Sequence, residues 1–197
     1  LVAAGCALCL TAFGEVSLVR DGEAQAVIVL SAPSGNRGRD MAFAQAASEI
    51  VQHVHWAVGV EIDVLQTLPE GGYRPVRIQR AQPGEEENPA APVPDLGGRI
   101  PLRIGDAAPS ALDAWVLERT GASNGFALVV SPDGVDLRGP LPVSSQHAAC
   151  ALLEQLGVRW YQPMEAGLVL PDGPDLALAE QHTTQKPAPE FDFMASV

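Results

Sequence analysis

The residues of this sequence best suited to chemistry are cysteines and histidines that occur in pairs. Cys6 and Cys9 form a C-x-x-C, which a redox domain places at a helix start after a strand. His147 and Cys150 are three apart and would share one helix face, but a nucleophilic thiol also needs exposure and an orienting third group. Because the first pair lies in an apolar N-terminal run and we expect Cys150 to be packed, neither pair predicts a catalytic site.

Metal-binding and phosphate-binding patterns are weak. His53 and His55 are two apart on an expected helix, so their side chains should point to different faces. Asp172 and Asp175 do not have the ligand density of a calcium loop. The loop at 34–38 lies between a strand and a helix, where phosphates often bind, but it matches neither the P-loop nor the dinucleotide fingerprint. We therefore expect no catalytic residue, cofactor or metal site in this chain.

The charge of the chain argues against two classes of partner. Its 197 residues include 12 Lys and Arg and 24 Asp and Glu, for a formal net charge of −12. Nucleic acids and anionic membrane surfaces are bound through basic residues, so neither is an expected partner. Apolar residues make up 47% and aromatic residues only 5%, which predicts a globular domain with a core built mainly from aliphatic side chains.

Residues 1–14 predict a secretory signal remnant. The run LVAAGCALCLTAF is almost purely apolar and leads into Ala12-Phe13-Gly14, which resembles a small-x-small cleavage site. The run is too short to span a membrane, and the alternative is a buried first strand or helix. The segment Ala3-Ala4-Gly5-Cys6 also resembles a lipobox, so a lipoprotein is an alternative to a freely secreted protein. We expect a secreted or periplasmic protein whose mature chain begins near Glu15.

Residues 15–183 predict one accessory-sized α/β domain. Apolar runs indicate strands, and Asp133-Gly134 between two of them suits a hairpin turn. Apolar residues at steps of three and four indicate helices, two of which have an N-cap candidate, Asp40 or Ser144, and a stop glycine, Gly59 or Gly157. The expected strands cover residues 18–20, 26–30, 60–65, 100–104, 125–130, 135–137 and 158–161, and the expected helices cover 40–58, 109–119 and 144–156.

This order predicts the fold class α/β (α+β), a two-layer sandwich in which a mixed β-sheet carries helices on one face. We expect helices 40–58 and 144–156 to pack on the same face, since each has one apolar stripe. The two stripes are expected at Ala44, Ala47, Val51, Val54 and Val58, and at Ala148, Ala149, Leu152 and Leu156.

Two segments interrupt or follow this domain. Residues 69–98 hold several Pro and the acidic run Glu85-Glu86-Glu87, which predicts a Pro-rich insertion or long exposed loop with a short edge strand at 76–78. Residues 184–197 include Pro187 and Pro189 and predict a linker toward a catalytic barrel that the chain does not contain.

Four local features occur in an order that resembles a known family. They are a strand-helix unit at 26–58 followed by Gly59-Val60, the strand end IPLRIG at 100–105, a hairpin from Gly125-Phe126 to Leu137-Arg138-Gly139, and the segment LLEQLGVRWYQP at 152–163. Together they resemble the N-terminal α/β domain of α-glucuronidase-like glycoside hydrolases, and they are similar to the small domain that precedes the barrel in β-hexosaminidases. The last segment is the specific one, and the resemblance covers roughly residues 26–191.

The resemblance implies a non-catalytic N-terminal accessory domain of a secreted bacterial glycoside hydrolase. Its partner would be a downstream catalytic barrel in the same polypeptide, and carbohydrate would be the substrate of that parent protein. The acid and base carboxylates of such families lie on barrel strands, so no residue here inherits a catalytic role. Arg159, Trp160 and Tyr161 are the candidates for contact with the barrel or its substrate cleft.

Each of these inferences has an alternative. In a purely structural role, Trp160 would be mostly buried, and Arg159 would pair with a carboxylate or cap a helix C-terminus. The chain could instead be an independent carbohydrate-binding module, but that function calls for a row of exposed aromatics, whereas Trp56, Trp115 and Trp160 are scattered along the sequence. A small enzyme using Cys150 and a histidine is the third alternative, and only the residue types support it.

Overall fold

The computed structural model describes residues 14–78, 91–105, 111–121, 124–161 and 167–186. The expectations for the signal remnant at 1–13, for the acidic run Glu85-Glu86-Glu87 and for the linker beyond residue 186 lie outside these described residues. No helix within the described ranges is both long enough and apolar enough to cross a membrane.

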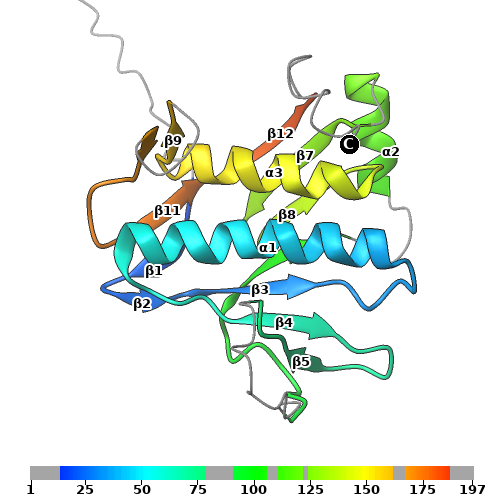
Figure 1. Cartoon of the computed structure of the whole chain (residues 1–197), viewed down its shortest axis with the longest axis horizontal. Coiled ribbons are helices and arrows are strands. Elements are labelled where there is room, and N and C mark those ends of the chain that lie inside the picture. The colour runs from blue at the N-terminus through cyan, green and yellow to red at the C-terminus, as the bar shows by residue number, and fades with distance from the viewer. Residues whose placement is uncertain (1–13, 79–90, 106–110, 122–123, 162–166, 187–197) are drawn as a thin grey trace, which may run out of the picture.

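A seven-stranded mixed sheet forms one layer of the domain, in the order β12-β7-β8-β6-β3-β4-β5 (Figure 1). The strands β4, β3, β6 and β8 are parallel, whereas β5 and β7 run antiparallel to their neighbours and β12 runs antiparallel to β7. The bounds are β3 Ala26–Leu30, β4 Val64–Thr67, β5 Tyr73–Pro75, β6 Ile100–Ile104, β7 Phe126–Ser131, β8 Gly134–Arg138 and β12 Gln181–Gln185. Since β12 reaches Gln185, it extends into the stretch expected to be a linker.

Two long helices form the second layer. α1 (Arg37–Val58) and α3 (Pro142–Gln155) lie side by side across one face of the sheet, as Figure 1 shows, and their buried residues share one hydrophobic cluster with the sheet. The shorter α2 (Ala111–Thr120) packs against β7 and β12. The predicted fold class, a two-layer α/β fold with a mixed sheet, is confirmed, and so is the shared face of α1 and α3.

The start of α1 differs from the sequence prediction by one turn. Asn36, not Asp40, is the N-cap, and its side chain accepts a hydrogen bond from the backbone N–H of Arg39 at 3.2 Å. Asn and Asp are about equally good caps, so composition alone does not choose between them. Asp40 instead accepts from the hydroxyl and backbone N–H of Ser34, at 2.7 and 3.1 Å. Gly59 has φ 73°, the left-handed conformation that commonly ends a helix, so the predicted end of α1 is confirmed.

The start of α3 and part of the α1 stripe were also misplaced. α3 begins at Pro142, whose fixed φ suits the first helical position, and Ser144 lies inside the first turn rather than at the N-cap. Gly157 has φ 100°, so its expected left-handed turn is confirmed. The buried residues of α1 are Phe43, Ala46, Ala47, Ile50, His53 and Val54, a face that shares only two members with the predicted stripe.

Two small sheets complete the fold. β1 (Glu15–Arg20) pairs with β2 (Glu23–Ala24) and with β11 (Leu176–Ala179), and β9 (Arg159–Trp160) pairs with β10 (Leu168–Val169). Asp21 and Gly22 both have positive φ, 53° and 76°, as a tight two-residue hairpin turn requires. The short strand and turn predicted here are therefore confirmed, as is the hairpin around Asp133-Gly134.

The ends of the Pro-rich segment cover the second face of the sheet instead of forming only an exposed loop. Val27, Val29 and Leu65 are buried on the face opposite α1, and Tyr73, Val93 and Leu96 pack over them. Tyr73 and Val93 exchange two backbone hydrogen bonds of 2.9 and 2.8 Å. The edge strand is β5, at Tyr73–Pro75, rather than the predicted 76–78. Placing it there lets the Tyr73 ring reach the apolar patch.

Candidate functional site

The three predicted site residues lie where the chain leaves α3 and enters β9. The left-handed Gly157 ends the helix, and the backbone N–H of Val158 donates to the carbonyl of Leu153 at 3.0 Å. Arg159 and Trp160 then pair with Val169 and Leu168. Successive residues of a strand point to opposite faces, so Arg159 and Trp160 diverge and do not form one site.

Trp160 is 42% exposed, so the prediction that it is mostly buried was wrong. The reason is topological, because β9 belongs to a two-stranded sheet with β10 and not to the main sheet. Its indole is therefore packed on one side only. Tyr161 is 74% exposed, and Val169 of β10 is also exposed. The β9–β10 pair thus presents large apolar side chains to solvent.

Trp160 packs against a histidine that the sequence did not single out for this role. The ring of His53 lies 5.3 Å from the Trp160 ring and 5.2 Å from the Trp56 ring, with edge-to-face angles of 73° and 70°. His53 is 4% exposed, and its Nδ1 is 2.8 Å from the carbonyl oxygen of Glu49, which can only accept, so Nδ1 donates this hydrogen bond. We call Trp56, His53 and Trp160 the aromatic cluster.

The aromatic cluster changes one conclusion drawn from the sequence. Trp56 and Trp160 looked scattered, but the fold brings both to the same imidazole, and each is about two-fifths exposed, at 40% and 42%. Trp115 stays apart on α2, where the guanidinium of Arg119 lies 5.8 Å from its ring. The cluster forms because β9 lies beside the C-terminal half of α1, and no local sequence pattern predicts that position.

A small pocket lies beside Trp56, on α1. Its volume is about 220 Å³, and we call it the α1 pocket. Five of its residues come from α1, and Ile78 comes from the segment that follows β5. His55 lines this pocket and is exposed, whereas His53 is buried, so the two histidines do point to different faces as predicted. The lining residues are Ser48, Val51, Gln52, His55, Trp56 and Ile78.

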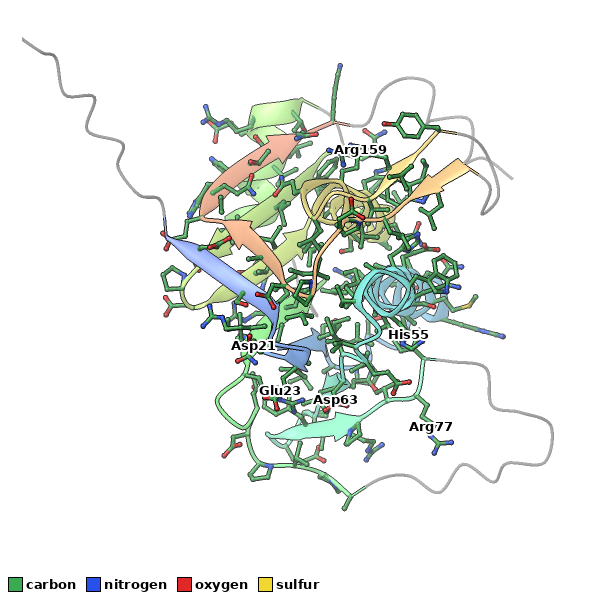
Figure 2. The ribbon with its side chains drawn as sticks, turned by 90° about the vertical axis from the view of Figure 1, so that its left-hand side faces the viewer. Asp21, Glu23, His55, Asp63, Arg77 and Arg159 are labelled. Atoms are coloured by element: carbon green, nitrogen blue, oxygen red, sulfur yellow. The ribbon has the colours of Figure 1, made fainter. Side chains whose placement is uncertain are left out.

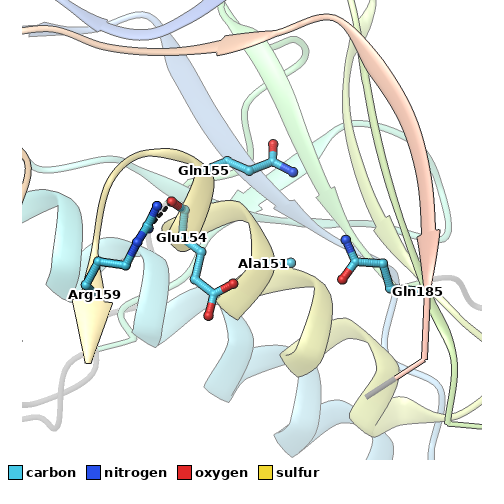
Figure 3. Close-up of a pocket in the computed structure, with 5 residues that line it drawn as sticks. All are labelled: Ala151, Glu154, Gln155, Arg159 and Gln185. Carbon is cyan, nitrogen blue, oxygen red and sulfur yellow. Dashed lines mark hydrogen bonds between the residues drawn. The ribbon is translucent and has the colours of Figure 1, made fainter. Parts of the chain in front are cut away.

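A second pocket lies at the end of α3 and is shown in Figure 3. This α3 pocket is shallow, open and about 420 Å³ in volume, with a single carboxylate, Glu154, in its lining. The Arg159 guanidinium donates to the backbone carbonyls of Glu154 and Val158, so it caps the C-terminus of α3. The capping alternative for Arg159 is therefore observed. The other lining residues are Ala151, Gln155 and Gln185.

Arg159 and His55 lie at opposite sides of the helical layer. In Figure 2, which looks along the two long helices, Arg159 is labelled beyond α3 and His55 beyond α1, on the side of the segment that carries Arg77. The α1 and α3 pockets are therefore separate sites with different chemistry. The described lining of the first has no Asp, Glu, Lys or Arg, and that of the second has one acid and one base.

Cys150 is exposed, so the expectation that it is packed was wrong. It lies on the outer side of α3, where neighbouring atoms still desolvate the thiol. This desolvation, together with the negative charges of Glu49 and Glu154, raises the pKa of the Cys150 thiol to about 11. The nearby His147 directs its Nδ1 to the carbonyl of Asn124 at 3.4 Å. A protonated thiol is a poor nucleophile, so this pair does not resemble an activated cysteine.

The remaining sequence candidates have structural partners. In the loop at 34–38, Ser34 bonds Asp40 and Asn36 caps α1, so the polar side chains serve the helix start. Asp175 accepts a hydrogen bond from the backbone N–H of Asp21 at 2.7 Å. Among the described residues, no group of three or more His, Cys, Asp or Glu is placed to hold a metal ion.

No protein-family model matches the chain, and no curated protein matches it either. The features of the chain that bear on its function are therefore the aromatic cluster, the two pockets and the segment with the sequence resemblance.

Proposed function

We propose that this chain is the non-catalytic N-terminal accessory domain of a secreted bacterial glycoside hydrolase that carries its catalytic barrel downstream. One observation supports this most. The segment with the specific resemblance, residues 152–163, is also where large aromatic side chains are exposed, at Trp160 and Tyr161. Exposed aromatic residues are enriched in protein interfaces and unusual on a free surface, so they fit a domain that packs against another one.

The carboxylates of the two pockets are consistent with a non-catalytic role. Glycosidases generally use two carboxyl groups that flank the bond, about 5–5.5 Å apart in retaining enzymes and about 6.5–9.5 Å apart in inverting ones. Glu154 is the single carboxylate in the lining of the α3 pocket, and the lining of the α1 pocket has none among the residues that the structure describes. Neither pocket has the pair of acids that this chemistry requires.

The test compares this chain with the product of the gene extended beyond Val197. Both proteins are assayed on aryl glycosides and on glucuronate-decorated xylan fragments. We expect turnover from the extended product only. Turnover by the 197-residue chain that is lost in the Glu154→Gln variant would contradict the proposal.

A second candidate function is an independent carbohydrate-binding module, and the aromatic cluster favours it. Two indoles that were distant in sequence share one imidazole and stay partly exposed, and one of them borders a pocket. Binding of polysaccharides by this chain alone, measured by affinity electrophoresis, would support this candidate. Equal mobility in the presence and absence of every polysaccharide would contradict it.

A further inference from the structure

The α1 pocket has a composition that points to a definite class of ligand. Ser48, Gln52 and His55 place a hydroxyl, an amide and an imidazole at its rim, and each of these groups can both donate and accept hydrogen bonds. Val51 and Ile78 are half-buried, pack against the main core, and provide an apolar floor. No Asp, Glu, Lys or Arg is among the described residues that line it. The pocket therefore suits an uncharged molecule with several hydroxyl groups.

Helical geometry keeps these groups together. Ser48, Val51, Gln52, His55 and Trp56 follow one another at helical steps of three, one, three and one, so they occupy one face of α1. Since the helix is fixed to the sheet by its opposite, buried face, the backbone positions from which these side chains extend are fixed by the fold. Ile78 approaches them from outside the helix and closes one side of the pocket.

Trp56 forms the wall of the pocket and is held in place from behind. Its ring contacts His53 edge-to-face at 5.2 Å, and His53 is itself buried and bonded to the carbonyl of Glu49. An indole fixed in this way can accept a flat apolar ligand face without first losing conformational freedom, which favours binding. The C–H face of a pyranose ring is such a surface, and its hydroxyl edge matches the rim.

We propose that the α1 pocket binds a single neutral pyranose unit, stacked on Trp56 and hydrogen-bonded to Gln52, Ser48 and His55. A volume of about 220 Å³ lies below the range of drug-sized sites, which is consistent with one ring rather than an oligosaccharide. This inference rests on the second candidate function and adds its site and ligand class. It assigns binding to Trp56 and not to Trp160, whose exposed surface the first proposal gives to a neighbouring domain.

The test uses ¹⁵N-labelled protein, the full 197-residue chain, with the indole N–H signals assigned from Trp→Phe variants. The probes are methyl glucoside, methyl xyloside, methyl galactoside and, as the charged probe, glucuronate. We expect at least one neutral pyranoside to shift the Trp56 signal and to leave the Trp115 signal unchanged. Trp56→Ala and Gln52→Ala should weaken binding of that sugar about tenfold or more, a loss of ~1.4 kcal/mol or more, while Trp115→Ala should not weaken it.

The possible outcomes distinguish an error in the proposed site from an error in the carbohydrate-binding function. If no sugar shifts any signal, both the second candidate function and this site are wrong. If a sugar binds with equal affinity to the Trp56→Ala, Gln52→Ala and original chains, binding exists but the site is wrong. Tighter binding of glucuronate than of every neutral pyranoside would overturn the ligand class. Circular dichroism of Trp56→Ala checks that it is folded, and Gln52→Ala, which changes an exposed residue, provides the second line of evidence.

Discussion

The imidazole of His53 packs edge-to-face against the indole of Trp160 at 5.3 Å, so a buried residue of α1 supports an exposed residue of β9. The contact joins the helical layer to a two-stranded sheet that lies outside the main sheet. Trp160 thus has a buried packing partner while about two-fifths of its surface faces solvent.

Replacing Trp160 with Ala should therefore cost less stability than truncating a core residue. We expect a loss of about 1–2 kcal/mol in the free energy of unfolding, because only one side of the indole is packed. Leu152→Ala is the matched control, since Leu152 is fully buried on α3 and should cost about 2–5 kcal/mol. Urea titration measures both. A loss for Trp160→Ala equal to that for Leu152→Ala would show that the indole is buried.

Gly105 and Gly59 have nearly the same φ angle but different surroundings, so alanine substitutions at the two positions compare the cost of close packing. Their φ angles are 74° and 73°, so alanine meets the same left-handed strain at both positions, about 1 kcal/mol. At Gly59 a Cβ has nothing within 4 Å, whereas at Gly105 it would lie 2.4 Å from the ring of Phe43, which is buried. We expect Gly105→Ala to cost about 1–3 kcal/mol more than Gly59→Ala in the same titration. Equal losses would indicate that the Phe43 ring can move aside.

Cys150 should react slowly with alkylating reagents. Raising the pKa of the thiol from 9.0 to about 11 reduces the thiolate fraction near pH 8 by roughly a hundredfold, and the thiolate is the reactive form. The measurement compares iodoacetamide rates for the folded and urea-unfolded protein, in a variant whose Cys6 and Cys9 are serine. Glu154→Gln removes one of the negative charges that raise this pKa and should speed the folded reaction. Equal rates in the folded and unfolded protein would contradict the raised pKa.

Asp136 should contribute more stability than Asp63, although both form ion pairs with arginine. The Asp136 carboxylate is 20% exposed and lies 3.3 Å from Arg103 and 3.4 Å from Arg138, whereas the Asp63 side chain is 68% exposed beside Arg99. We expect Asp136→Asn to cost about 1–3 kcal/mol and Asp63→Asn at most ~1 kcal/mol. High salt should change the stability of the Asp63 pair more, because solvent ions screen it. The reverse order of the two losses would contradict the burial argument.

The parts of the fold that depend on local pattern were predictable. The body of α1, its end at Gly59, the turn at Gly157 and the hairpin around Asp133-Gly134 follow from periodicity and from residues that favour one backbone conformation. Helix starts were less predictable, since Asn36 and Asp40 are equally good caps and only the bond to Arg39 distinguishes them.

The candidate sites depended on contacts between distant segments and could not be predicted in the same way. The sequence identified Trp160 as part of a strand but not which sheet that strand joins, and its exposure follows from that choice. The α1 pocket requires Ile78 beside α1, and the aromatic cluster requires β9 beside α1. The exposure of Cys150 likewise depends on which side of α3 faces the sheet.

The paired hydrogen bonds between Tyr73 and Val93 have a practical consequence for engineering. They fasten Tyr73 and Val93 to each other at the sheet edge, so this contact closes a loop in the chain. Additional sequence placed in this loop adds little closure entropy, about 0.6 kcal/mol for each doubling of length, and does not alter the register of β3 and β4. A guest peptide inserted into this loop after Ile78 should therefore leave the core and the α1 pocket unchanged.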